Sequence, residues 1–186
     1  MIEQAHTQVR EKEANMYASH EDFQAIFNKD LRELYQLSFL LTRDAAKAER
    51  CLVVGLEDCV RGNRVFREWA YSWAKRAIIQ NAISELKPRP SQSNPFLPGV
   101  IVPDSDQLSS RSGRHFEVDA ILRLADFERF VFVMSALEHY SEHDCALLLG
   151  CSARDIREGR ARALKELAHS PLMDRSQNQL FVLEKK

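Results

Sequence analysis

The sequence predicts an all-α protein with two small helical domains joined by a proline-rich linker, the second domain containing a helix-turn-helix. Apolar residues recur at three- and four-residue steps on both sides of the linker, which is typical of amphipathic helices. Five of the six prolines lie between residues 88 and 103. Strand-like alternation competes with the helical pattern only briefly, at residues 130–134.

The linker divides the chain. Its prolines are followed by serine, glutamine and glycine residues up to residue 114. Proline lacks a backbone donor and restricts the residue before it, so no helix should run through this segment. A loop of this length is uncommon inside one compact domain, which favours two domains joined by a tether. The expected parts are a flexible N-terminal arm (1–20), a first helical domain (21–87), the linker (88–114), a second domain (115–170) and a C-terminal tail (171–186).

The first domain begins with two expected helices. Residues 21–41 carry one continuous apolar stripe, and Asp44 is a suitable N-cap for a second helix over residues 45–60. Gly62 and the asparagine after it tolerate the left-handed conformation that commonly follows a helix. We therefore expect the second helix to end there with a left-handed cap.

A third helix is expected over residues 64–86. Trp69 and Trp73 lie four residues apart in it, on the same stripe as several aliphatic side chains. We expect both tryptophans to be mainly part of the core.

The second domain is expected to begin with a short helix at residues 118–125, followed by a helix over residues 127–138 that Asp126 caps. Ser141 then starts a third helix, and Gly150 ends it, because a tight turn needs a residue free to adopt positive φ. Ser152 caps the next helix. Two capped helices around a glycine turn predict a helix-turn-helix.

The last helix of this domain is basic. Residues 152–168 hold five basic side chains against three acidic ones. Ile156, Ala163 and Leu167 are spaced to be buried, and side chains at the N-terminal end of such a helix can reach the edges of DNA bases. The candidate DNA-binding residues here are Ser152, Arg154, Arg157, Arg160, Arg162 and Lys165, of which Arg154, Arg157, Arg162 and Lys165 are expected to point outward.

Composition excludes several other classes of protein. The net charge is −1, and the four cysteines form no CxxC pair, so we predict buried thiols and neither a metal site nor a cofactor. No apolar run approaches the length of a membrane span, and the charged first thirty residues hold no signal peptide, which predicts a cytoplasmic protein. No phosphate loop, HExxH motif or nucleophile elbow is present, so an enzyme is not expected.

Three segments carry a family resemblance. These are LTRDAAKAE and FREWAYSWAKRAII before the linker, and the stretch from LRLADFERFVFVM to ARDIREGRARALKEL after it. In this pattern the chain resembles the extracytoplasmic-function group of bacterial RNA polymerase sigma factors, over about residues 21–87 and 115–168. The resemblance implies a DNA-binding protein of transcription initiation whose partners are promoter DNA, core RNA polymerase and, as is usual for the family, an anti-sigma protein.

The resemblance also assigns roles to residues of the first domain. It implies that this domain binds the polymerase and melts the promoter, where aromatic side chains stack on unpaired bases and basic groups hold the strand. The candidates for the strand are Trp69, Tyr71, Trp73, Lys75 and Arg76. The candidates for polymerase binding are Glu49, Arg50 and Val53.

The chain departs from the family pattern at several of these positions. Arg50 and Val53 stand where the family usually has an acid and a glutamine, and a base in place of an acid reverses the sign of a contact with a basic partner. Gly159 and Arg160 replace an arginine and a leucine in the last helix, and glycine there should weaken it.

A second hypothesis therefore stays open. Residues 115–170 hold seven basic and ten acidic side chains, and this net negative charge is unfavourable for binding DNA phosphates. The chain would then be a sigma-derived DNA-binding regulator, or a protein-interaction module, that no longer binds polymerase.

Overall fold

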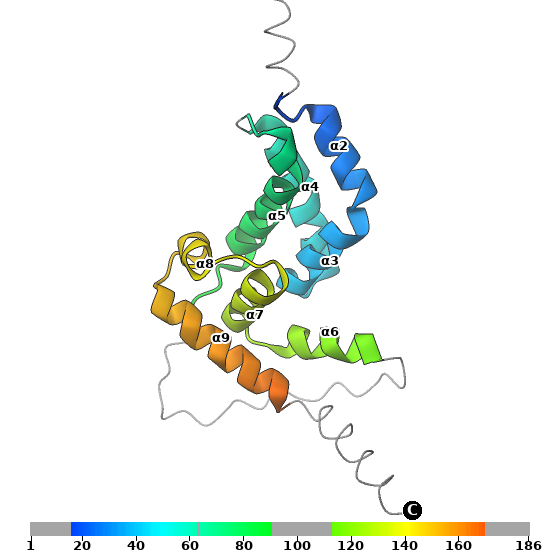
Figure 1. Ribbon diagram of the computed structural model, residues 1–186. Helices are drawn as coiled ribbons and strands as arrows, with labels where there is room; N and C mark the ends of the chain where they lie inside the picture. The colour runs from blue at the N-terminus through cyan, green and yellow to red at the C-terminus, as the bar shows by residue number, and fades with distance from the viewer. Residues whose placement is uncertain (1–15, 63, 91–112, 170–186) are drawn as a thin grey trace, which may run out of the picture. The chain divides into compact units, whose positions relative to one another are not determined.

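The computed structural model describes residues 16–62, 64–90 and 113–169 (Figure 1). The chain divides into two compact units, Met1–Lys87 and Pro88–Lys186. Every regular element in the described ranges is a helix, apart from one isolated bridge between Tyr17 and Phe66. The predicted all-α fold is therefore confirmed. No helix in these ranges is long and apolar enough to cross a bilayer.

The first unit packs its helices around a core of aromatic, aliphatic and small side chains. The residues predicted to form one helix over 21–41 form two helices, because the helix is interrupted at Asp30. Leu31, the first residue of the second helix, is 49% exposed. The helices of this unit are α2 (His20–Lys29), α3 (Leu31–Thr42), α4 (Ala45–Arg61) and α5 (Ala70–Leu86), with a 3₁₀ turn, η1 (Arg67–Trp69), before α5.

Helix α4 begins as predicted and ends differently. The Asp44 carboxylate accepts a hydrogen bond from the Lys47 N–H at 2.8 Å, which is the expected N-cap. The helix stops at Arg61, but Gly62 has φ −76° and ψ −170°, so Gly62 itself does not adopt the expected left-handed conformation; the asparagine after it lies outside the described residues. A Cβ at Gly62 would lie 2.6 Å from the Asp58 carbonyl oxygen, which explains the glycine as a close approach.

Helix α5 begins six residues later than predicted, and the two tryptophans therefore differ from the prediction in their burial. Trp69 ends the preceding 3₁₀ turn and is 58% exposed, so its expected place in the core is wrong. Trp73 is half-buried against the core. The buried face of α5 consists instead of small and aliphatic side chains: Ala70, Ala74, Ala77, Ile78, Ile79 and Ala82.

The first described helix of the second unit begins at Gly113, five residues before the short helix predicted over residues 118–125, and ends at Arg123. Asp126 is not the side-chain cap that was predicted, because it is the first residue of its helix and its carboxylate binds Arg129 at 2.7 Å. Residues 130–134, where alternation was visible, are helical. The elements are α6 (Gly113–Arg123), α7 (Asp126–Phe132), the π-helical turn η2 (Val133–Leu137), α8 (Glu142–Leu149) and α9 (Ala153–Ala168).

A buried arginine organises the start of α7. Arg129 is fully buried, and its two terminal nitrogens donate to the Leu124 carbonyl at 2.9 Å and to the Asp126 carboxylate at 2.7 Å. Phe127 and Phe130 of the same helix are also buried. A buried guanidinium is tolerated when it is hydrogen-bonded in this way.

Gly159 is a packing requirement of α9 rather than only a weak point in it. It is buried, and a Cβ added there would lie 2.8 Å from Cε1 of Phe127 and 3.4 Å from Cγ2 of Val131. The residue next to it, Arg160, is exposed. The expectation that Gly159 simply weakens the helix is therefore incomplete, because the glycine allows α7 and α9 to approach closely.

We expect Gly159→Ala to destabilise the second unit. Overpacking should cost about 1–3 kcal/mol, partly offset by a gain of roughly 0.5–1 kcal/mol in helix propensity. Urea unfolding followed by circular dichroism measures the difference. A shorter side chain at the contact, Phe127→Leu, should reduce the cost of Gly159→Ala, whereas a stabilising Gly159→Ala in the unmodified chain would contradict this packing.

Candidate nucleic-acid interface

Helices α8 and α9 are joined by a three-residue turn, and each helix begins with a serine N-cap. The Ser141 hydroxyl accepts from the Asp144 N–H at 3.1 Å and so caps α8. Gly150 follows α8 with φ +63°, and its N–H donates to the Ala146 carbonyl. This left-handed position is where glycine was expected, because other residues are strained there.

The start of α9 is fixed by a reciprocal cap. Ser152 accepts from the Asp155 N–H at 3.2 Å, and the Asp155 carboxylate accepts from the Ser152 N–H at 2.9 Å. The Ser152 hydroxyl also donates to the Asp155 carboxylate at 2.6 Å, and this bond first and the bond from the Ser152 N–H second lower the pKa of Asp155. Because this pKa is lowered in the folded protein, the cap stabilises α9 fully at pH values above the ordinary pKa of an aspartate. The stabilisation is lost as the pH falls through the lowered pKa.

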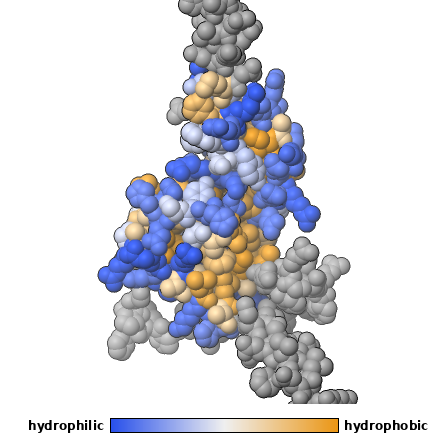
Figure 2. All heavy atoms as spheres, viewed as in Figure 1, coloured by the Kyte–Doolittle hydropathy of each residue, from blue (hydrophilic) through white to orange (hydrophobic). Residues whose placement is uncertain are grey.

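The basic side chains of α9 divide into an exposed set and one anchored member. Arg154, Arg157, Arg160 and Lys165 are exposed, and Figure 2 shows hydrophilic side chains gathered over the N-terminal part of this helix. Arg162 does not point outward as predicted. Its Nε donates to Oε1 of Glu128 at 2.7 Å, and the Glu128 side chain is only 3% exposed.

The exposed arginines at the start of α9 are also paired with acids. Arg154 binds Glu158 at 2.7 Å, one turn along the same helix, and Arg157 binds Glu142 of α8 at 3.2 Å. The Ser152 hydroxyl already donates a hydrogen bond to the Asp155 carboxylate. Arg160 and Lys165 have no acidic partner in the part of the chain that the structure describes.

In the first unit, the structure brings two of the candidate strand-binding residues together. The Tyr71 hydroxyl donates to Glu33 at 2.8 Å, and the Lys75 ammonium lies 5.1 Å from the centre of the Tyr71 ring. Arg76 and Trp73 are half-buried on the same helix. Tyr71 and Lys75 therefore form one small polar-aromatic group at the start of α5.

A second aromatic group in this unit is not predicted by the sequence. Tyr17 stacks on Phe66 with ring centres 4.9 Å apart, and Phe66 and Trp69 make a T-shaped contact with ring centres 5.2 Å apart. The Arg64 guanidinium lies 5.6 Å from the Tyr17 ring. Tyr17 had been assigned to the N-terminal arm, and no spacing rule links it to residues almost fifty positions later.

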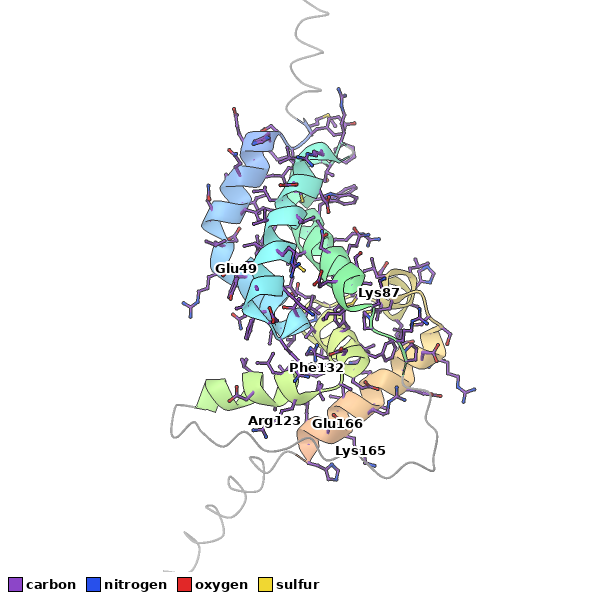
Figure 3. All side chains as sticks on the ribbon, turned by 180° about the vertical axis from the view of Figure 1, so that it is seen from behind. Glu49, Lys87, Arg123, Phe132, Lys165 and Glu166 are labelled. Atoms are coloured by element: carbon purple, nitrogen blue, oxygen red, sulfur yellow. The ribbon has the colours of Figure 1, made fainter. Side chains whose placement is uncertain are left out.

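The candidate polymerase-binding residues lie on the exposed side of α4. Glu49, labelled in Figure 3, is exposed, and Val53 is 57% exposed. Arg50 pairs with Glu85 of α5 at 3.5 Å. The base that replaces an acid at position 50 thus has an acidic neighbour supplied by the next helix.

The cysteines are positioned as packing residues. Cys51, Cys59 and Cys145 are buried, and Cys151 is half-buried. Burial raises the pKa of Cys59 to about 12 and that of Cys145 to about 11, so neither thiol is reactive at neutral pH. Within the described ranges, no group of histidine, cysteine and acidic residues could hold a metal ion.

The comparison with curated proteins agrees with the resemblance found in the sequence. No family model matches the chain. The chain is 26% identical over 149 residues to "ECF RNA polymerase sigma factor SigM" of Mycobacterium tuberculosis, in two strains, covering 78% of this chain and 75% of the relative. The solved structure of the sigma factor RpoE in complex with the anti-sigma factor NepR from Bartonella quintana matches with a TM-score of 0.42 and 17% identity, over 80% of this chain and 95% of that one.

Proposed function

We propose that this chain, which is similar to extracytoplasmic-function sigma factors, is a divergent sigma factor that binds core RNA polymerase and directs it to promoters. The observation that carries the proposal is the similarity to SigM, since it spans 149 residues and 78% of the chain. A shared helix-turn-helix alone would align only the second unit. An anti-sigma protein is proposed as a further partner, by analogy with the family.

The proposed reading element is α9, with α8 as the supporting helix. Arg154 and Arg157 lie in its first two turns, where side chains of a recognition helix reach bases in the major groove. Arg160 and Lys165 lie further along and are suited to phosphate contacts. We withdraw Arg162 from the contact set and assign it to the support of α9 against α7, because Glu128 holds it.

The proposed melting element comprises the exposed Trp69, which precedes α5, and the pair of Tyr71 and Lys75 in the first turns of α5. An exposed indole is suited to stacking on an unpaired base, and a lysine is suited to holding the strand. Phe66 supports the indole through a T-shaped contact, and Tyr17 stacks on Phe66. Arg76 is proposed to hold the strand from the same helix.

We expect Trp69→Ala to reduce promoter opening. Loss of one stacking contact costs about 1–3 kcal/mol, which corresponds to a reduction of roughly 5- to 150-fold. Permanganate reactivity of unpaired thymines, in a complex of the full chain with core polymerase and promoter DNA, measures the open fraction. The control is Leu31→Ala, another exposed apolar side chain of the same unit; equal opening by both variants would contradict the role of Trp69.

The proposed polymerase-binding surface is the exposed side of α4, at Glu49, Arg50 and Val53. Glu85 lies close enough to Arg50 to offset its charge. A basic groove on the partner would therefore meet less repulsion than Arg50 alone suggests.

The second candidate function is a sigma-derived DNA-binding regulator, or a protein-interaction module, without polymerase binding. It is favoured by Arg50 and Val53, and by the acidic partners of the α9 arginines. Run-off transcription separates the two functions. Core polymerase from the organism that encodes the chain should produce specific transcripts from a library of its genomic fragments only when the chain is added, and their absence would overturn the first proposal.

A further inference from the structure

Two acidic side chains lie at the exposed N-terminal half of α9, each paired with an arginine. Glu158 accepts from Nε of Arg154 at 2.7 Å, and Glu142 accepts from Nη1 of Arg157 at 3.2 Å. The two carboxylates come from different helices, α9 and α8. All four side chains are between 42% and 81% exposed, so the pairs face solvent, where a DNA phosphate would approach.

These pairs change the charge that α9 presents. Of its five basic side chains, Arg162 is held by the buried Glu128, and Arg154 and Arg157 are held by exposed acids. Only Arg160 and Lys165 have no acidic partner among the described residues. A phosphate that binds Arg154 or Arg157 must replace a carboxylate and then lie close to its negative charge.

We propose that Glu142 and Glu158 are affinity-limiting residues, which hold Arg157 and Arg154 and so weaken the binding of α9 to DNA phosphates. The proposal rests on the proposed DNA-binding role of α9. The acids act most strongly against sequence-independent binding, because that binding is supplied by phosphate contacts. Base-edge contacts made by the same arginines can compensate for the lost pairs.

The test uses the full chain, a random-sequence 30-base-pair duplex and a titration at several salt concentrations. We expect Glu158→Gln and Glu142→Gln each to tighten binding about 3- to 10-fold, the range of one additional charge contact, and to steepen the dependence on salt. The matched control is Glu166→Gln, which removes the same charge near the C-terminal end of α9, beside Lys165 (Figure 3). It should change the affinity by less than the other two.

A second pair of variants tests whether the gain passes through the arginine. In an Arg154→Ala background, Glu158→Gln should give no more than the small gain of the Glu166→Gln control, because the released partner is missing. A gain that persists in full without Arg154, or a gain as large with Glu166→Gln, would overturn the proposal. If the original chain binds the duplex and all Glu variants bind equally, the inference fails alone. If neither the chain nor any variant binds even at low salt, the proposed DNA-binding function fails with it.

Discussion

Arg162→Ala is expected to destabilise the second unit by about 2–4 kcal/mol, somewhat less than the roughly 3–5 kcal/mol for breaking a fully buried ion pair, because the arginine is partly exposed. The Glu128 carboxylate would lose its bond to Arg162 while its side chain stays 3% exposed. Its other oxygen is already buried without a hydrogen bond in the described structure. An uncompensated buried carboxylate is costly, so the loss should appear as a lower free energy of unfolding.

Arg160→Ala provides the matched control for this prediction. It removes the same type of side chain two residues away, at an exposed position without an acidic partner in the described ranges, and should change stability by less than about 0.5 kcal/mol. Urea unfolding followed by circular dichroism compares the two variants. Equal stability of both would show that the pair of Arg162 with Glu128 contributes nothing. If Arg162→Ala lowers the stability, a loss of DNA binding in this variant reflects partial unfolding of the second unit and not a lost DNA contact.

The combined variant Arg154→Ala, Arg157→Ala should weaken binding to promoter DNA by about 10²-fold or more, since each base-reading arginine typically contributes 1–3 kcal/mol. The ion pairs with Glu158 and Glu142 reduce this effect without removing it, because exposed pairs are weak. Fluorescence anisotropy with a promoter fragment selected from the transcribed genomic library measures the affinity.

An Arg32→Ala, Arg123→Ala variant is the control, because it removes two exposed arginines from outside α9. It should lower affinity only through the change in net charge. If the Arg154, Arg157 variant binds as tightly as this control, α9 does not read DNA. The protein-interaction alternative would then be favoured.

The sequence predicted best those features that depend on a few neighbouring residues. Asp44, Ser141 and Ser152 cap helices where their residue types and spacing indicated, and Gly150 adopts the left-handed conformation. Each of these is decided within one turn of helix. The all-α character followed in the same way from local periodicity.

The errors arose where a contact joins residues distant in the sequence. Arg162 has helical spacing that places it near the outer face, but Glu128, 34 residues earlier, draws it toward α7. Trp69 matched the apolar stripe only on the assumption that α5 begins before it, whereas a 3₁₀ turn rotates it into solvent. Periodicity contains no information about either partner or turn.

The departures from the family pattern also gain a physical explanation. Gly159 sits against Phe127, so a larger side chain at this point of α9 would collide with α7. Arg50 pairs with Glu85 of α5, and no spacing rule predicts this contact between two helices. Both departures thus have a partner within their own unit.

The most direct test of the proposed function is co-elution of the purified full chain with core RNA polymerase in size-exclusion chromatography at physiological salt. We expect a stoichiometric complex, and we expect Val53→Lys, which adds a positive charge to the exposed side of α4 where a basic groove would face it, to weaken that complex. A chain that is folded by circular dichroism and yet elutes entirely apart from the polymerase would contradict the proposal that this protein is a sigma factor.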